Sequence, residues 1–346
     1  MKYNQLGESN LKVSEICLGT MTYGQQNTIE DAQEQLDYAI AQGINFIDTA
    51  EMYPVPPRPE TQGRTEAYIG EWLKKQQRDK LIIATKIAGP GRPVKWVRGG
   101  STNIQRNNIK QAVEDSLKRL QTDYIDLYQI HWPDRYVPIF GQTEYNPNFE
   151  RETVPIAEQL AAFDDLIKAG KIRYLGLSNE TPWGVTQFSQ IAKQLGLPKV
   201  ISIQNAYNLL NRVFDSALAE ACYHENVGLL AYSPLGFGLL SGKYVHSKKP
   251  ENTRLTLFEN FGQRYLKPNV SEAVAAYVEI AQSHNLKPAQ LAIAFVLSRW
   301  FTTSTIIGAT TLEQLKENID SLNVVLDKEI LAELNAVHTR YPNPAP

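Results

Sequence analysis

The feature that most constrains the fold is an alternation, repeated eight times, between short apolar segments and longer amphipathic ones. Such short segments are typical of buried strands, and the longer ones carry apolar residues at helical spacing. Repeated strand–helix units imply a parallel sheet. Eight of them in one chain fit an α/β fold of the (β/α)8 TIM-barrel type better than an open sheet. The predicted strands lie near residues 16, 46, 81, 124, 172, 200, 228 and 304.

Other segments are predicted to add to this repeat at both ends. Residues 3–5 and 12–14 flank a stretch of turn-forming residues and predict an N-terminal β-hairpin. Extra helices are predicted towards the C-terminus, at about 270–284, 289–299 and 327–339. We find no linker or low-complexity segment, and no Gly-x-Gly-x-x-Gly of a dinucleotide-binding domain follows the first strand. Residues 1–346 are therefore predicted to form a single barrel domain.

Four long strand-to-helix loops are expected on the C-terminal face of such a barrel, where active sites of this fold are built. They comprise the proline-rich 54–59 region, the glycine-rich 89–100 region, 133–152 and 240–268. Loops 54–64, 89–102 and 133–152 are expected to set substrate specificity. The sequence does not identify the substrate itself.

Charge and composition exclude several classes of partner. The net charge is −2 with no block of like charges, so neither a nucleic-acid nor a membrane surface is expected. No apolar run approaches the length of a membrane span, and the N-terminus lacks a signal-peptide core. Cys17 and Cys222 have no metal-ligand spacing and give little reason to expect a disulfide. The expectation is a cytoplasmic protein that acts on a small molecule, with its oligomeric state open.

Three predicted strands end in side chains that can do chemistry. Asp48 ends the second strand, Lys86 the third and His131 the fourth, and Tyr53 lies on the loop just after Asp48. Alone, Asp48 could equally order a turn. Burying its carboxylate is unfavourable unless a cation pairs with it, and in a barrel these neighbouring strand ends converge. We therefore expect the four side chains to form one catalytic group.

This group suits proton transfer to a carbonyl oxygen. A phenol with a pKa of about 10 is a weak acid at neutral pH, and a nearby lysine ammonium is expected to lower the pKa of Tyr53. Asp48 would hold Lys86 charged, and His131 would orient the carbonyl. Reduction also needs a hydride donor, which no side chain can be, so a nicotinamide cofactor is implied.

The same residues could support two other chemistries. A metal could use Asp48, Asp126 and His131, but strand alternation places Asp126 and His131 on opposite faces, and Lys86 would repel a cation. We therefore expect no metal site. Lys86 could also act as a Schiff-base nucleophile. The segments of the chain that match cofactor-binding motifs argue against a Schiff-base role for Lys86.

The chain resembles the aldo/keto reductases along nearly its whole length. The residues from Gly43 to Ala50 followed by Tyr53, the Thr85-Lys86 pair and the His131-Trp132-Pro133 triplet match the catalytic motifs of that family. Within the family it is similar to the bacterial Tas-like reductases, which share the insertion at 51–61. Further matching segments are 170–179, 203–205, 231–236 and 306–309 with Glu317-Asn318.

The resemblance implies that Tyr53 is the proton donor, tuned by Lys86 and Asp48, and that His131 orients the substrate. It also implies a cofactor extended across the C-terminal face of the barrel. Ser178, Asn179 and Gln204 would bind the carboxamide, Tyr232 would stack on the nicotinamide, the loop from Ser233 to Gly238 would meet the pyrophosphate, and Lys243 and Arg254 would clamp the phosphates. The full set implied to bind the cofactor is Gly19, Thr20, Met21, Asp48, Ser178, Asn179, Gln204, Tyr232, Ser233, Pro234, Leu235, Gly236, Phe237, Gly238, Lys243, Arg254, Gly308, Thr310, Gln314, Glu317 and Asn318.

The sequence departs from the family pattern in two places. Pro54 replaces the glycine that usually follows the tyrosine, which changes the expected shape of the substrate pocket. Gly308 and Gln314 stand where many NADP-binding members have a basic residue, so NADP(H) rather than NAD(H) is expected on the strength of Arg254, Lys243 and Thr310.

The implied function is NADP(H)-dependent reduction of an aldehyde or ketone to an alcohol. The alternative is a cofactor-binding regulatory subunit of the same fold with little turnover, as in potassium-channel β subunits. Those proteins lack the full match at the histidine position, which this chain keeps as His131.

Overall fold

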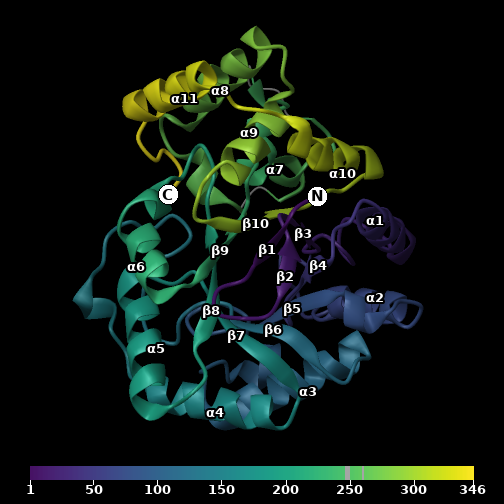
Figure 1. Cartoon of the computed structure of the whole chain (residues 1–346), viewed down its shortest axis with the longest axis vertical. Coiled ribbons are helices and arrows are strands. Elements are labelled where there is room, and N and C mark those ends of the chain that lie inside the picture. Colours follow the sequence, from purple (N-terminus) through teal and green to yellow (C-terminus); the bar gives the residue numbers. More distant parts are fainter. Residues whose placement is uncertain (246–249, 259–260) are drawn as a thin grey trace.

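A closed barrel of eight parallel strands forms the centre of the protein (Figure 1). This computed structural model describes residues 1–245, 250–258 and 261–346, so parts of the predicted 240–268 loop, residues 246–249 and 259–260, lie outside the described residues. The predicted (β/α)8 barrel is confirmed, with each strand within two residues of its expected start. In order around the barrel the strands are β10 (Thr302–Ile307), β3 (Ile16–Gly19), β4 (Phe46–Asp48), β5 (Ile82–Ile87), β6 (Ile125–Ile130), β7 (Ile172–Ser178), β8 (Val200–Ala206) and β9 (Gly228–Tyr232).

Helices surround the barrel, and the predicted C-terminal helices are present (Figure 1). Local signals set their ends: Thr181 caps a helix that begins with Pro182, and Gly196 ends it in a left-handed conformation. The short α7 was not predicted, because one helical turn has no periodicity to detect. The helices are α1 (Ile29–Ala41), α2 (Arg64–Leu73), α3 (Arg106–Leu120), α4 (Ile156–Lys168), α5 (Pro182–Leu195), α6 (Ala217–Glu225), α7 (Arg254–Leu257), α8 (Val270–Ser283), α9 (Pro288–Leu297), α10 (Leu312–Ile319) and α11 (Lys328–Arg340).

Strand alternation decides which side chains enter the barrel. Along β5, Ile82 and Ala84 belong to an apolar cluster inside the barrel, whereas Ile83 packs outward with the helices. The same two-residue period turns Lys86 inward at the end of the strand. The barrel interior is therefore apolar at the N-terminal end and polar at the C-terminal end.

The predicted N-terminal hairpin closes the apolar end of the barrel. Strands β1 (Tyr3–Gln5) and β2 (Lys12–Ser14) pair in antiparallel fashion. Leu6, Leu11 and Val13 from this hairpin are buried in the same cluster as the inward-facing strand residues. The hairpin leaves the opposite end, with its polar side chains, as the face that a ligand can reach.

Replacing an inward-facing residue of this plugged end should strongly destabilise the barrel. Phe46 is fully buried in the cluster, so Phe46→Ala is expected to lower the free energy of unfolding by about 3–5 kcal/mol. Phe149, which is 60 % exposed, is the matched control, and Phe149→Ala should change stability little. Urea unfolding followed by circular dichroism measures both, and equal effects of the two substitutions would contradict this account.

Candidate active site

A cavity of about 860 Å³ lies at the C-terminal ends of the barrel strands. Strand ends supply its floor, and the loops predicted to set specificity supply part of its wall, through Val55, Pro57, Arg92 and Phe140. Asp48, Tyr53 and His131 line the cavity, which brings together three of the four predicted catalytic side chains. The fourth, Lys86, is fully buried directly behind them.

A buried ion pair joins the ends of β4 and β5. The Lys86 Nζ atom lies 2.6 Å from Asp48 Oδ2 and donates a second hydrogen bond of 2.7 Å to the Thr49 carbonyl. Burial opposes the charged form of Lys86, but the Asp48 carboxylate and the Tyr53 phenol more than offset it and raise the pKa of Lys86. Lys86 is therefore a fixed positive charge beneath the cavity floor.

Tyr53 is held above this charge by its loop. Its backbone N–H donates to the Ala50 carbonyl at 3.0 Å, and its carbonyl accepts from the Gly63 N–H at 2.9 Å. The Lys86 Nζ atom lies 4.9 Å from the centre of the Tyr53 ring. Burial raises the pKa of Tyr53. Lys86 acts in the expected direction and lowers this pKa, but its effect is smaller than that of burial, which was not anticipated.

His131 lies beside Tyr53 as a neutral imidazole. The two ring centres are 5.7 Å apart in an edge-to-face arrangement. Burial, with the positive charges of Lys86 and Arg92, holds the pKa of His131 well below its ordinary value of 6.5. Its Nδ1 atom is buried without a hydrogen-bond partner in the described part of the chain. A neutral imidazole keeps one N–H that can donate to a ligand in the cavity.

Gln129 belongs to this group and was missed in the sequence. Its Nε2 atom donates to Asp48 Oδ1 at 3.1 Å, and Gln204 Nε2 donates to the same oxygen at 2.8 Å. Asp48 thus receives hydrogen bonds on both oxygens, which satisfies a buried carboxylate. The missed signal was strand alternation, because Gln129 lies two residues before His131 and must share its face.

The residues predicted to bind a cofactor surround one cavity. All of them line it except Gly236, which is buried within the 233–238 loop. That loop follows β9 and has a strained backbone, with Ser233 and Phe237 in the left-handed region at φ of 56° and 60°. Such strain is typical of ligand-binding loops. The structure therefore brings the predicted residues together without testing the role of each.

Two cations that line the cavity, Lys243 and Arg254, have no carboxylate partner among the described residues. Arg254 packs over the Phe237 ring at 4.9 Å, and Lys243 lies against Gly238, where an added Cβ would come within 3.1 Å of its side chain. Burial lowers the pKa of both side chains, and the Arg254 charge lowers the pKa of Lys243 further. An uncompensated cation pair beside a glycine loop fits a phosphate-bearing group.

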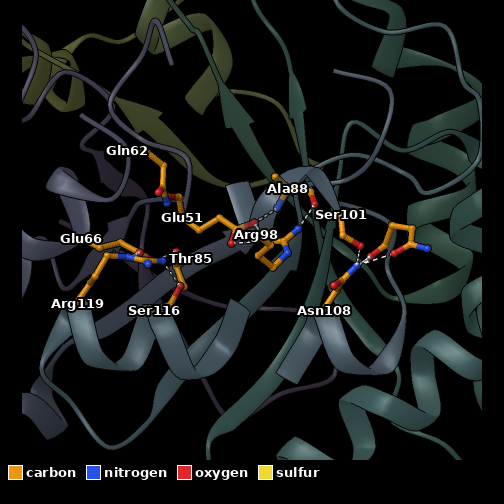
Figure 2. Close-up of polar contacts among 11 residues, drawn as sticks. Glu51, Gln62, Glu66, Thr85, Ala88, Arg98, Ser101, Asn108, Ser116 and Arg119 are labelled. Carbon is orange, nitrogen blue, oxygen red and sulfur yellow. Dashed lines mark hydrogen bonds and ion pairs between the residues drawn. The ribbon is translucent and has the colours of Figure 1, made fainter. Parts of the chain in front are cut away.

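A second buried ion pair anchors the loop that carries Tyr53 (Figure 2). The Glu51 carboxylate pairs with Arg98 and accepts a hydrogen bond of 2.5 Å from the Ala88 N–H. Arg98 in turn donates to the Ala88 carbonyl at 2.9 Å, and Gln62 donates to the Glu51 carbonyl at 2.7 Å. The β4 and β5 loops are therefore tied together two residues from the phenol.

The outward face of β5 is anchored in a similar way (Figure 2). Thr85, next to Lys86, donates to the buried carboxylate of Glu66 at 2.6 Å, and Arg119 of α3 pairs with the other oxygen of Glu66 at 2.6 Å. Glu66 lies on α2, so one carboxylate joins two helices to the strand. The position of Lys86 is thus fixed from both faces of β5.

The alternative metal site is not assembled. Asp126 faces away from His131 and pairs with Arg78 and Arg173, each at 2.7 Å. Among the described residues, no three His, Cys, Asp or Glu side chains are grouped so as to hold a metal ion. Cys17 and Cys222 are separate buried thiols. Among the helices that the structure describes, none is long and apolar enough to cross a bilayer.

Comparison with known proteins identifies the family. The model of the aldo/keto reductase family matches residues 15–339. The chain belongs to the aldo/keto reductase family. It is 53 % identical to the protein named tas of Escherichia coli (strain K12) over the full length of both chains. The resemblance to the Tas-like aldo/keto reductases is therefore confirmed.

Other members of the aldo/keto reductase family carry different names. A protein of Babesia bovis named aldo-keto reductase is 40 % identical, covering 77 % of this chain and 98 % of its own. A probable voltage-gated potassium channel subunit beta of Oryza sativa subsp. japonica is 30 % identical, covering 97 % and 96 %. The family and its reductase-named members support an oxidoreductase.

The Glu51–Arg98 pair predicts a pH-dependent loss of stability. Arg98→Met would leave a buried carboxylate unpaired, which is expected to cost about 3–5 kcal/mol in free energy of unfolding at pH 8. Burial already raises the pKa of Glu51 above 4.5 against the opposing Arg98 charge, and removing Arg98 raises it further. A carboxyl group whose pKa is raised by folding stabilises the folded state at low pH, where it is protonated, and loses this contribution as the pH rises. The loss of unfolding free energy caused by Arg98→Met should therefore be smaller at pH 5 than at pH 8.

The matched control is an exposed ion pair of the same type. Arg106 pairs with Asp165, and both side chains are more than half exposed. Arg106→Met should therefore cost less than about 1 kcal/mol at either pH. Urea unfolding of both variants and the parent at pH 5 and pH 8 measures the difference. If Arg98→Met lowered the free energy of unfolding equally at both pH values, the variant would not contain an unpaired charge on Glu51, and this account would be contradicted.

Proposed function

We propose that this protein reduces an aldehyde or ketone to an alcohol with NADP(H), with Tyr53 as the proton donor. The observation that carries the proposal is the joint placement of Asp48, Lys86, Tyr53 and His131 at the catalytic part of one cavity. The cavity also holds the cation pair of Lys243 and Arg254, which fits the phosphates of a dinucleotide. Family membership supports the same activity.

The proton comes from the chain itself. The raised pKa of Tyr53 keeps its phenol protonated at neutral pH, as a general acid must be. When the phenol gives up its proton to the carbonyl oxygen, the fixed charge of Lys86 stabilises the phenolate. The neutral His131 donates a hydrogen bond that orients the carbonyl towards Tyr53. NADPH, when bound, supplies the hydride that the carbonyl carbon receives.

The nicotinamide end would be held by side chains that the protein has already oriented. Asn179 Nδ2 donates to the His131 carbonyl at 2.8 Å, and Tyr232 Oη donates to Asn179 Oδ1 at 2.7 Å. Gln204 uses its Nε2 atom on Asp48, which leaves its Oε1 atom to accept a hydrogen bond from the carboxamide. Ser178 and Tyr232 complete this wall of the cavity. These contacts fix the residues before any cofactor arrives, which reduces the entropy lost on binding.

The rest of the dinucleotide would follow the wall towards β10 and α10. The loop from Ser233 to Gly238 would meet the pyrophosphate, and Lys243 and Arg254 would bind the phosphate groups, including the adenosine 2′-phosphate that NADH lacks. Gly19, Thr20 and Met21 line the cavity beside the strand ends. The adenosine end would lie against Gly308, Thr310, Gln314, Glu317 and Asn318.

A regulatory role with little turnover is the second candidate, because a relative named as a potassium channel subunit beta shares 30 % identity over nearly the whole chain. Such a protein would bind NADPH and hardly reduce carbonyls. The complete group of Asp48, Tyr53, Lys86 and His131 favours turnover.

Removing the phenolic hydroxyl should abolish most of the turnover while leaving cofactor binding in place. Tyr53→Phe is expected to lower kcat for an aromatic aldehyde by about 10²–10⁴-fold, because the general acid is lost. The assay is NADPH oxidation followed by absorbance, with NADPH binding measured by fluorescence titration. Tyr223→Phe is the matched control, since Tyr223 is 68 % exposed and lies outside the cavity lining.

The outcomes distinguish the candidates. Full activity of Tyr53→Phe would rule out the proposed proton donor. A wild-type protein that binds NADPH tightly but turns over no carbonyl compound would favour the regulatory candidate.

Cofactor preference should follow the unpaired cations. NADPH is expected to bind more tightly than NADH, and Arg254→Gln should weaken NADPH binding by about 10–100-fold, as expected for one charge-assisted contact. NADH binding should weaken less. Lys118→Met, on an exposed part of α3, is the control for removing one positive charge. Equal affinities of the wild-type protein for NADPH and NADH in a fluorescence titration would overturn the assignment.

A further inference from the structure

Buried or partly buried cations in this protein are usually paired with carboxylates. Lys86 pairs with Asp48, Arg98 with Glu51, Arg119 with Glu66 and Arg135 with Glu180. Four cations that line the cavity have no carboxylate partner among the described residues: the partly buried Lys243, Arg254 and Arg264, and the exposed Arg92. The first two are accounted for by the phosphates of the proposed cofactor. The proposed cofactor does not account for Arg92 and Arg264.

Arg92 and Arg264 form a second pair around one aromatic ring. The Arg92 guanidinium carbon lies 4.6 Å from the centre of the Phe140 ring, and that of Arg264 lies 5.5 Å from it. The three residues come from separate loops, which are docked on one another: Lys267 Nζ donates to the Gly141 carbonyl at 2.6 Å. A ring that contacts both guanidiniums holds them in place, since cations pack favourably on aromatic faces.

This pair lies at the catalytic part of the cavity. Arg264 donates to Tyr232 Oη at 3.5 Å, and the Tyr232 hydroxyl donates to Asn179, whose amide contacts the His131 carbonyl. Arg92 is close enough to His131 for its charge to help lower the pKa of that imidazole. Both arginines therefore face the space where a carbonyl substrate would lie.

The charge of Arg264 acts against that of Arg92. Partial burial, together with the charge of Arg264, lowers the pKa of Arg92. Burial also opposes the charge of Arg264, but the Tyr232 and Tyr265 phenols more than offset it and raise the pKa of Arg264. The acidic residues lining the cavity cannot compensate this pair: Asp48 is engaged with Lys86, and Glu317 pairs with Lys287 at 3.5 Å beside α10. An anion held by both guanidiniums would relieve the repulsion and accept several N–H donors.

We propose that Arg92 and Arg264 form an anion-binding subsite for the substrate, so that the carbonyl compound this protein reduces carries a carboxylate or phosphate group. This inference rests on the proposed carbonyl reduction for its meaning but concerns different residues. The anionic group binds over Phe140 while the carbonyl points to Tyr53 and His131. The subsite discriminates because an uncharged substrate leaves both guanidiniums without an anionic acceptor.

The test compares anionic and neutral aldehydes of similar size. 4-Carboxybenzaldehyde is paired with its methyl ester, and 4-formylphenyl phosphate with 4-methoxybenzaldehyde, so the two arms separate a carboxylate from a phosphate ligand. The wild-type protein is expected to prefer at least one anionic member by tenfold or more in kcat/KM, mainly through KM. Arg92→Gln and Arg264→Gln should each reduce this preference about tenfold, as expected for losing one charge-assisted contact. Arg92→Lys, which keeps the charge but loses the planar fork, should fall between.

A matched control removes a similar cation elsewhere. Arg340 packs over Tyr341 at 5.0 Å, outside the cavity lining, so Arg340→Gln removes one charge and one cation–aromatic contact without touching the subsite. It should keep the wild-type preference. Raising the salt concentration should weaken the preference of the wild-type protein, because a partly exposed charge pair is screened.

A second readout does not depend on turnover. Calorimetry of the NADP⁺-loaded protein should detect benzoate or phenyl phosphate binding, and Arg264→Gln should weaken it about tenfold. If the wild type reduces neutral aldehydes with no preference for either anion, the subsite is overturned while the proposed function stands. If it reduces no aldehyde but the anion binds and the variant loses it, the proposed function fails and the subsite stands. If the arginine variants weaken NADPH binding instead, the pair belongs to the cofactor and the proposal is overturned.

Discussion

The ion pair between Lys86 and Asp48 is the constraint on which the catalytic end of the barrel depends. Two charges taken out of water are tolerated only with close contact and with their remaining hydrogen-bonding capacity satisfied. Here the pair is 2.6 Å apart, Thr49 supplies an acceptor to the ammonium, and Gln129 and Gln204 supply donors to the carboxylate. The four strands that carry these groups are thereby held in one arrangement.

The barrel supports this pair by separating polar from apolar layers. The hairpin and the inward-facing apolar residues fill one end, as Leu6 and Phe46 illustrate, so the polar layer lies only at the other. Two further buried carboxylates fix the surroundings of Lys86 from outside the polar layer. Glu51 ties the loop of Tyr53 to the end of β5, and Glu66 ties β5 to helices α2 and α3 (Figure 2). Rigid support of this kind is what a site needs in order to hold a reacting group in position.

The sequence was sufficient for features that depend on local periodicity. The alternation of strands and helices predicts the barrel, and the strand ends together with the family motifs predict the residues that line the cavity. Prediction from the sequence failed for features that depend on contacts between residues far apart in the chain. The net pKa direction of Tyr53 is set by burial, which no motif reports. Arg92 and Arg264 lie in loops without periodicity, and only the folded chain shows that they meet across Phe140.

The distribution of charge around the cavity explains how one pocket can serve two ligands. The cations that fix the protein itself are neutralised by carboxylates, so they contribute little field to the cavity. Among the described residues, the cavity-lining cations without a carboxylate partner form two groups, Lys243 with Arg254 and Arg92 with Arg264. A field of one sign in a low-dielectric cleft attracts anions. The proposed anionic cofactor and anionic substrate would therefore both be attracted to this cavity, each by its own pair of cations, with the carbonyl held at Tyr53.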